Sequence, residues 1–244
     1  MGFTNSPLVT YTNITNNKTN NRNHAIDTIT VHCIVGQWTA KQGCDYFATT
    51  NRKCSANYVV GKDGSIGLSV EEKDRSWCSS NAANDHRAIT IEVASDTKAP
   101  YAVTDKAYNA LIQLIADICK RNNIKELKWK ADSSLIGQVD KQNMTVHKWF
   151  ANKDCPGEYL YERHSDIASK VNEILNAKPA KIEIKIGSTV RLKKGAKTFQ
   201  GGNLASFVYE RNHQVKQINV DRVVITYNGI VVAAVRKSDL TVVN

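Results

Sequence analysis

The chain has 244 residues and a formal net charge of +10, and 41% of its residues are hydrophobic. This length predicts one large domain or two smaller ones, and the composition excludes a collagen-like or wholly disordered chain. No apolar run approaches the ~18 residues that a membrane span needs, so membrane insertion is not expected. The first residues lack the basic and apolar regions of a secretory signal, so we expect a protein made in the cytoplasm without a signal peptide.

Residues 1–176 alternate between strand and helix patterns after a start rich in Asn and Thr. Residues 1–24 predict an extended leader that contributes little to a core. Apolar, β-branched runs predict strands, and apolar residues at helical spacing predict helices. The predicted strands are residues 27–35, 57–61, 65–69 and 88–94, and the predicted helices are residues 39–50, 104–122 and 159–176. This alternation predicts an α/β domain over residues 1–176.

The pattern changes at residues 177–182, which contain a proline, have no apolar periodicity and are predicted to form a linker. Residues 183–244 predict only short strands. Two of these strands, residues 220–227 and 230–235, are joined by an Asn-Gly pair that suits a type I′ turn. About 60 residues of short strands predict a small all-β barrel.

Most of the excess positive charge lies in the last quarter of the chain. Residues 179–244 contain 11 basic and 4 acidic residues, whereas residues 1–178 contain 22 and 19. A basic region of this kind attracts polyanions such as nucleic acid, an acidic membrane or an anionic cell-wall polymer. A solvated surface that only keeps the protein soluble has the same charge, so both interpretations stay open.

Two histidines and one cysteine are candidate ligands of a metal ion. The six cysteines of the chain form no CxxC pair and are expected to be reduced, mostly buried thiols. His32 lies in an apolar strand, where a histidine is either a hydrogen-bonded core residue or a metal ligand. With His147 and Cys155 it would supply the three donors of a catalytic zinc site whose fourth position stays open to water. Cys33 is an alternative thiolate, but we expect it on the opposite face of the strand from His32.

Glu92 interrupts an apolar strand. A buried carboxylate without a partner is costly, so a partner or a functional role is expected for it. Simple alternation along the strand could instead place Glu92 on a face that water reaches. The residue pattern leaves both interpretations open.

Five segments of the chain resemble those of a known enzyme family. They are residues 29–32 (ITVH), 54–64 (CSANYVV, then KDG), 89–92 (ITIE), 146–147 (VH) and 153–157 (KDCPG). Residues 20–176 thus resemble the zinc-dependent N-acetylmuramoyl-L-alanine amidases of the type 2 group, which share a fold with peptidoglycan recognition proteins. The whole chain resembles a phage endolysin or an autolysin of Gram-positive, clostridial type.

The resemblance implies a mixed central sheet flanked by helices and a set of site residues. It makes His32, His147 and Cys155 the ligands of a Zn²⁺ ion. Glu92 matches the carboxylate that activates the attacking water, and Lys153 matches the cation that faces the developing oxyanion.

Three positions depart from the family's pattern. Ala56 stands where many relatives have Tyr, Asn57 where they have His, and Cys78 where His is frequent. The first two changes give more weight to Glu92, and the third removes an expected substrate contact. None of them alters an expected metal ligand.

Residues 183–244 resemble the SH3-like cell-wall-binding modules of clostridial lysins, most clearly in residues 193–199 and the Gly pair that follows. The two resemblances imply a peptidoglycan hydrolase that cleaves the amide bond between N-acetylmuramic acid and L-alanine. Its expected partners are peptidoglycan and the associated anionic wall polymer, and it would act at the wall after release by phage lysis or autolysis. The alternatives are a peptidoglycan-binding receptor without catalysis and a nucleic-acid-binding protein that uses the basic module, although no nucleic-acid partner is expected.

Overall fold

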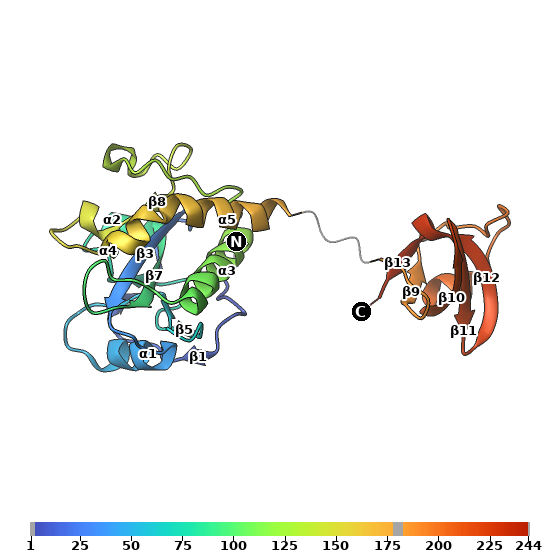
Figure 1. Cartoon of the computed structure of the whole chain (residues 1–244), viewed down its shortest axis with the longest axis horizontal. Coiled ribbons are helices and arrows are strands. Elements are labelled where there is room, and N and C mark those ends of the chain that lie inside the picture. Colours follow the sequence, from blue (N-terminus) through green and yellow to red (C-terminus); the bar gives the residue numbers. More distant parts are fainter. Residues whose placement is uncertain (1–2, 178–182, 244) are drawn as a thin grey trace. The chain divides into compact units, whose positions relative to one another are not determined.

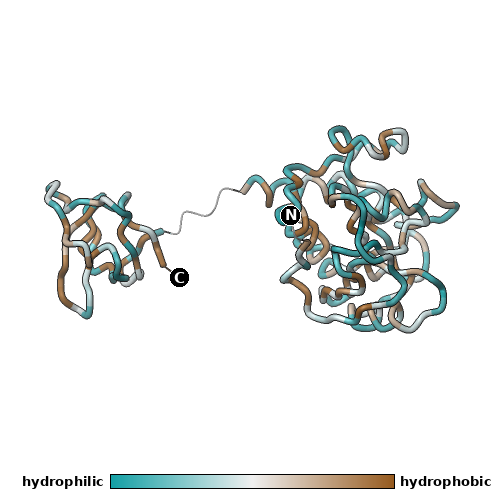
Figure 2. Tube along the Cα trace, turned by 180° about the vertical axis from the view of Figure 1, so that it is seen from behind, coloured by the Kyte–Doolittle hydropathy of each residue, from teal (hydrophilic) through white to brown (hydrophobic). Residues whose placement is uncertain are grey.

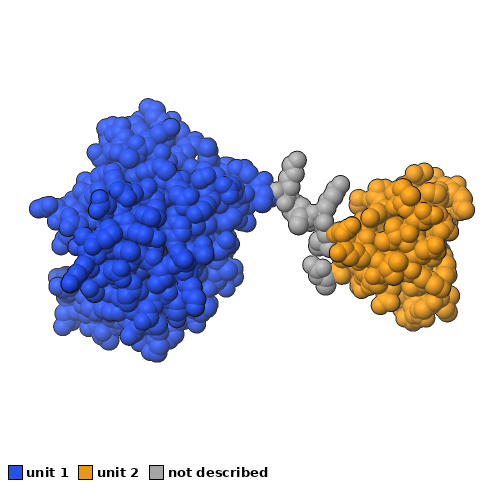
Figure 3. Space-filling view, in the orientation of Figure 1, with its two compact units in different colours: residues 1–177 blue, residues 178–244 orange. Residues whose placement is uncertain are grey.

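The computed structural model describes residues 3–177 and 183–243. The chain divides into two compact units, residues 1–177 and 178–244, which are blue and orange in Figure 3. Of the linker expected at residues 177–182, only residue 177 lies within the described residues. Among the helices of the described part, none is long and apolar enough to cross a membrane.

The first unit is built on a six-stranded mixed sheet (Figure 1). Its strands lie in the order β1 (Tyr11–Thr12), β5 (Ile66–Leu68), β4 (Tyr58–Val60), β7 (Ala88–Ser95), β3 (Thr28–Val35) and β8 (Met144–Thr145). The pair β4–β5 is antiparallel, as expected for a hairpin, and the other neighbours run parallel. A separate two-stranded sheet is formed by β2 (Lys18–Thr19) and β6 (Arg75–Ser76). The expected mixed α/β fold is confirmed.

Helices cover both faces of the central sheet. The main core packs α3 (Asp105–Arg121) and α5 (His164–Asn176) against alternate residues of the strands, such as Tyr58. A smaller core packs α1 (Ala40–Thr49) against the residues between them, such as Val59. Because side chains of a strand alternate between its faces, the sheet lies between α1 and the α3–α5 layer (Figure 1).

Two helices begin where the sequence places a cap. The hydroxyl of Thr39 accepts a hydrogen bond from the backbone N–H of Gln42 in a capping box that starts α1. The hydroxyl of Thr104 caps α3 by accepting a hydrogen bond from the N–H of Ala107. The helices predicted at residues 39–50 and 104–122 are therefore confirmed.

The prediction of a single helix at residues 159–176 is wrong. The structure has two helices there, α4 (Gly157–Glu162) and α5, which are separated at Arg163. The carbonyl of Leu160 lies 2.7 Å from Nδ1 of His164 and also accepts from the N–H of Arg163 at 3.1 Å. The imidazole therefore takes an acceptor that a continuous helix would use for its own backbone.

The leader predicted at residues 1–24 contributes more to the core than expected. Strand β1 extends the sheet, and Ser6, Thr15 and Arg22 are buried. The Arg22 guanidinium donates to five backbone carbonyls, those of Glu72, Asp74, Asp85, His86 and Ala88. Polar side chains that satisfy buried backbone groups give no hydropathy signal, so the sequence pattern missed this packing.

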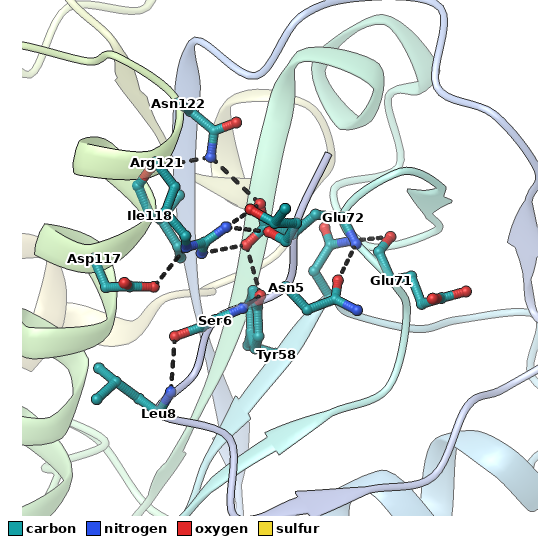
Figure 4. A network of polar contacts seen from close by, with 12 residues as sticks. Asn5, Ser6, Leu8, Tyr58, Glu71, Glu72, Asp117, Ile118, Arg121 and Asn122 are labelled. Carbon is teal, nitrogen blue, oxygen red and sulfur yellow. Dashed lines mark hydrogen bonds and ion pairs between the residues drawn. The ribbon is translucent and has the colours of Figure 1, made fainter. Parts of the chain in front are cut away.

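A buried carboxylate joins the start of the chain to the sheet and to α3 (Figure 4). Glu72 accepts two hydrogen bonds from the Arg121 guanidinium, at 2.6 and 2.9 Å, and one from the Tyr58 hydroxyl at 2.6 Å. The backbone N–H of Ser6 donates to the same hydroxyl at 2.8 Å. This network contains none of the expected site residues and holds the scaffold on which they stand.

The described part of the second unit is a five-stranded antiparallel sheet with a short α-helix, α6 (Ser206–Glu210), and a 3₁₀ helix (Lys237–Asp239). Its strands lie in the order β12 (Ile230–Arg236), β11 (Arg222–Tyr227), β10 (His213–Asn219), β9 (Thr189–Leu192) and β13 (Leu240–Val242). Asn228 and Gly229 both have positive φ, as a type I′ turn between β11 and β12 requires. The unit has its own apolar core, and Figure 2 shows hydrophobic stretches in both units.

Candidate metal centre and active site

His32 and Glu92 lie side by side on one face of the central sheet. They are register partners in the parallel strands β3 and β7, so their side chains project to the same side. Ile34, two residues after His32, packs in the smaller core beneath α1. Glu92, the carboxylate that interrupts the apolar strand β7, thus lies next to His32 of β3.

The segment after β8 brings His147 and Cys155 to the same place. Strand β8 pairs only with the first half of β3, so the edge of β3 beside His32 is free of a strand partner among the described residues. The chain then turns through a short 3₁₀ helix (His147–Trp149) and returns, and the N–H of Lys148 donates to the carbonyl of Cys155 at 3.1 Å. Sγ of Cys155 lies 3.3 Å from Nδ1 of His32.

The three expected ligands converge although they are remote in sequence. One donor atom from each of His32, His147 and Cys155 lies within 4.8 Å of the other two. The imidazole rings of the two histidines have centroids 5.1 Å apart. Two imidazoles and one thiolate within this distance fit a zinc ion and leave a coordination position for water.

The electrostatics of the cluster also suit a cation. Burial, together with the nearby His147, lowers the pKa of His32 to about 3, so the ring is in its neutral, metal-binding form. Contact with the Cys33 thiol, burial and the charge of Glu92 raise the pKa of Cys155 well above its usual value. A bound cation favours the thiolate and reverses this penalty. Nε2 of His32 and Oε2 of Glu92 are buried and have no hydrogen-bond partner within the described residues.

Glu92 has the properties of a proton acceptor. Burial raises the pKa of its carboxyl group to about 7, and a hydrogen bond from Cys78 partly opposes that rise. Sγ of Cys78 lies 3.8 Å from Oε1 of Glu92. A carboxyl group with a pKa near neutrality can both accept and return a proton at physiological pH.

Two hollows meet at the cluster and share His147 and Cys78. The first, of about 530 Å³, is bordered by Glu92 and by the aromatic residues Trp38, Tyr46, Phe47 and Trp77. The second, of about 630 Å³, is bordered by four cationic residues, Arg52, Lys53, Arg75 and Lys153. Lys153 is exposed, and together with burial its charge lowers the pKa of His147. His147, Glu92 and Lys153 border these hollows, and His32 and Cys155 adjoin them through His147.

Ser80 is a site residue that the sequence did not reveal. Its hydroxyl lies 2.9 Å from Nε2 of His147, which leaves Nδ1 of that ring for a metal ion. Such a second contact commonly orients a metal-binding imidazole. A single serine in a loop has no pattern by which the sequence could have marked it.

The family of N-acetylmuramoyl-L-alanine amidases (Amidase_2) matches residues 22–158, which include all five expected site residues. The chain belongs to this family. Among solved structures, PlyL is 17% identical, with a TM-score of 0.51, and the match covers 70% of this chain and 97% of that one. An AmpD derivative (19%, TM-score 0.47, covering 69% and 99%) and the endolysin amidase LysCS from Clostridium intestinale URNW (17%, 0.45, 67% and 97%) are also similar. No curated protein sequence matches the chain.

The three positions at which the sequence departs from the resemblance, Ala56, Asn57 and Cys78, have two different surroundings in the structure. Ala56 and Asn57 are fully buried, and the Asn57 amide donates to the carbonyl of Val70 at 3.2 Å. Oδ1 of Asn57 accepts from the N–H of Thr90, also at 3.2 Å, so the side chain fixes two neighbouring segments. Cys78, in contrast, borders both hollows and contacts Glu92.

Proposed function

We propose that the chain is a peptidoglycan hydrolase that cleaves the amide bond between N-acetylmuramic acid and L-alanine. The observation that carries this proposal is the convergence of His32, His147 and Cys155 beside Glu92 in a chain of the amidase family. Two hollows that open beside this cluster leave room for a substrate on either side of the reacting bond.

His32, His147 and Cys155 are the residues that would hold a Zn²⁺ ion. Zinc in such a site lowers the pKa of water toward neutrality and polarises a carbonyl group, which a resonance-stabilised amide needs. The ring of His32 is rigidly held because it is buried in the centre of the sheet, and Ser80 orients the ring of His147. These contacts would keep the donors in place during the reaction.

Glu92 would act as the general base and then as the general acid. With its pKa near 7, the carboxylate can accept the proton of the attacking water and later give it to the leaving amine of L-alanine. Glu92 borders one of the hollows while its Oε2 is buried, and the strand register holds the group at one position beside His32.

Lys153 would offset negative charge on the tetrahedral intermediate. It is exposed at the hollow bordered by His147, and no ion pair within the described residues neutralises it. A positioned charge of this kind typically contributes about 3 kcal/mol to transition-state stabilisation.

The second unit would be an SH3-like module, residues 183–244, that binds the anionic cell-wall polymer and keeps the catalytic domain, residues 1–176, at its substrate. A cation between two exposed rings supports this role. The Arg211 guanidinium lies 5.0 Å from the ring of Phe207 and 4.7 Å from that of Tyr227. Aromatic faces pack against sugar rings, and the guanidinium can pair with a phosphate or carboxylate. The protein would act at the wall after release by phage lysis or autolysis.

The decisive experiment is mass spectrometry of purified peptidoglycan digested with the full chain. We expect new L-alanine amino termini and intact muramic acid, complete loss of cleavage with a chelator, and recovery with added Zn²⁺. Cleavage that a chelator leaves unchanged would contradict the zinc mechanism. Binding to peptidoglycan without cleavage at any metal concentration would instead indicate a receptor.

A further inference from the structure

A second group of possible metal ligands adjoins the first. One donor atom from each of His32, Cys78 and Glu92 lies within 4.8 Å of the other two. This group shares only His32 with the first group. Cys78 and Glu92 approach His32 from the β7 side of strand β3, whereas Cys155 approaches it beyond the end of β8. The two groups therefore define neighbouring positions.

The backbone holds Cys78 firmly at this place. Its N–H donates to Oδ2 of Asp85 at 3.0 Å. The preceding residue, Trp77, makes two hydrogen bonds with Ser55. The backbone N–H of Ser55 donates to the carbonyl of Trp77 at 3.0 Å, and the N–H of Trp77 donates to the hydroxyl of Ser55 at 2.9 Å. Glu92 and His32 stand on the two central strands. Donors that the scaffold already fixes lose little entropy when they bind an ion.

Two atoms of this group lack hydrogen-bond partners among the residues that the structure describes. Oε2 of Glu92 and Nε2 of His32 are buried and make no hydrogen bond with any described residue, and His32 is fully buried. Nδ1 of His32 is the nitrogen that faces Cys155, so Nε2 is the nitrogen left over. Buried polar atoms without partners are costly, and a cation between them would satisfy both.

We propose that Cys78, Glu92 and Nε2 of His32 form a second position for a thiophilic divalent cation such as Zn²⁺ or Cd²⁺. Thiolate, imidazole and carboxylate together select ions of this class over Mg²⁺ and Ca²⁺. Binding displaces the Cys78 thiol proton and the remaining ring proton of His32 to solvent. If the proposed function holds, the second ion also inhibits the enzyme, because a coordinated Glu92 carboxylate cannot accept a proton from water.

The test is a cadmium titration of the metal-free full chain, read from the thiolate-to-cadmium charge-transfer absorbance and from the bound metal per chain. We expect two steps in the native chain, of which Cys78→Ser loses the weaker step and Cys155→Ser the tighter one. Cys54→Ser is the matched control, because Cys54 borders the same two hollows but belongs to neither ligand group. This control should keep both steps. Cys78→Ala repeats the test if the serine variant folds poorly.

The outcomes separate this inference from the proposed function. A single step in the native chain, or two steps in Cys78→Ser, would overturn the second site. In a parallel assay, excess Zn²⁺ should inhibit cleavage by the native chain and by Cys54→Ser at least roughly tenfold more strongly than cleavage by Cys78→Ser. Two binding steps without any amidase activity would leave the second site standing and overturn the proposed function alone.

Discussion

Single residues decide the chemistry of the proposed site, and Glu92 is the most informative of them. A carboxylate on a central strand would normally be excluded from such a position. Here it stands beside His32 with a pKa of about 7, and Cys78 is its side-chain hydrogen-bond partner among the described residues. The environment of Glu92 therefore suits proton transfer more than it suits stability.

We predict that Glu92→Gln keeps the metal ion held by His32, His147 and Cys155 but lowers turnover by roughly 10²–10⁴-fold, since the amide cannot accept a proton. Metal content per chain and hydrolysis of a soluble muramyl peptide are the two measurements. Equal turnover in the variant and the native chain would show that Glu92 is not the base.

Glu92 should also leave a signature in the pH dependence of stability. Its carboxyl pKa is raised from 4.5 to about 7, so the folded state holds this proton more tightly than the unfolded state does. The stabilisation is present below about pH 4.5 and is lost as the pH rises through 7, by about 3 kcal/mol in total. We expect the difference in unfolding free energy between the metal-free native chain and Glu92→Gln to fall over this range. Taking the difference removes the opposite contribution of His32, and a constant difference would contradict the prediction.

Cys155→Ser is predicted to lose the tightly bound zinc and most of the activity, because a serine hydroxyl is a poor substitute for a thiolate. Zinc retained after dialysis, measured by elemental analysis, checks the first part. A variant with full zinc and full activity would make Cys155 a structural residue.

At the scale of elements, the parallel pairing of β3 with β7 and the buried pair of Glu72 with Arg121 hold the scaffold together. Glu72 is fully buried, and its partner stands at the end of α3. The pair ties α3 to the segment after β5 and, through Tyr58, to the start of the chain. Tyr58 lies on the face of the sheet opposite to His32, so this network bears on stability rather than on chemistry.

We predict that Arg121→Ala destabilises the first unit by about 3–5 kcal/mol, because it leaves the charge of Glu72 buried and uncompensated. Denaturant unfolding measures the change. Lys170→Ala is the matched control, since Lys170 pairs with Asp166 on an exposed face and should have little effect. Similar losses of unfolding free energy in the two variants would show that the buried pair stabilises the fold no more than an exposed pair does.

At the scale of the whole molecule, the chain joins two units with separate cores. Residues 179–244 carry 11 basic and 4 acidic residues, so an anionic surface would attract this part of the chain most strongly. A module that holds the enzyme on its insoluble substrate raises the local concentration without adding a contact to the reacting bond.

Truncation after residue 177 is therefore predicted to reduce binding to purified cell walls and the rate of wall clearing, while hydrolysis of a soluble muramyl peptide stays unchanged. Co-sedimentation with purified walls measures the binding, and hydrolysis of the soluble muramyl peptide measures the catalytic rate. Equal losses on both substrates would mean that the second unit supports the catalytic fold rather than targeting it.

Local sequence was sufficient for most strands and for the helix starts, because side-chain periodicity and capping act over a few residues. The strands at residues 57–61 and 65–69 and the helix at residues 39–50 were predicted correctly for this reason. Residues 159–176 were not, because a histidine side chain competes with the backbone at Leu160. The polar packing of Arg22 was missed as well, since its partners are carbonyls from distant segments.

The sequence by itself determined the kinds of donors available, two imidazoles, a thiolate and a carboxylate, and their order along the chain. Only the tertiary structure decided that they meet. His32 and Glu92 become neighbours through the β3–β7 register, and Cys155 reaches His32 from 123 residues away because the chain returns after β8. Strand pairing between remote segments is set by the burial of the whole core, which no local pattern encodes. The loop after β6, which Asp85 and Ser55 hold in place, brings Cys78 beside Glu92, a contact that neither residue's sequence neighbours could have indicated.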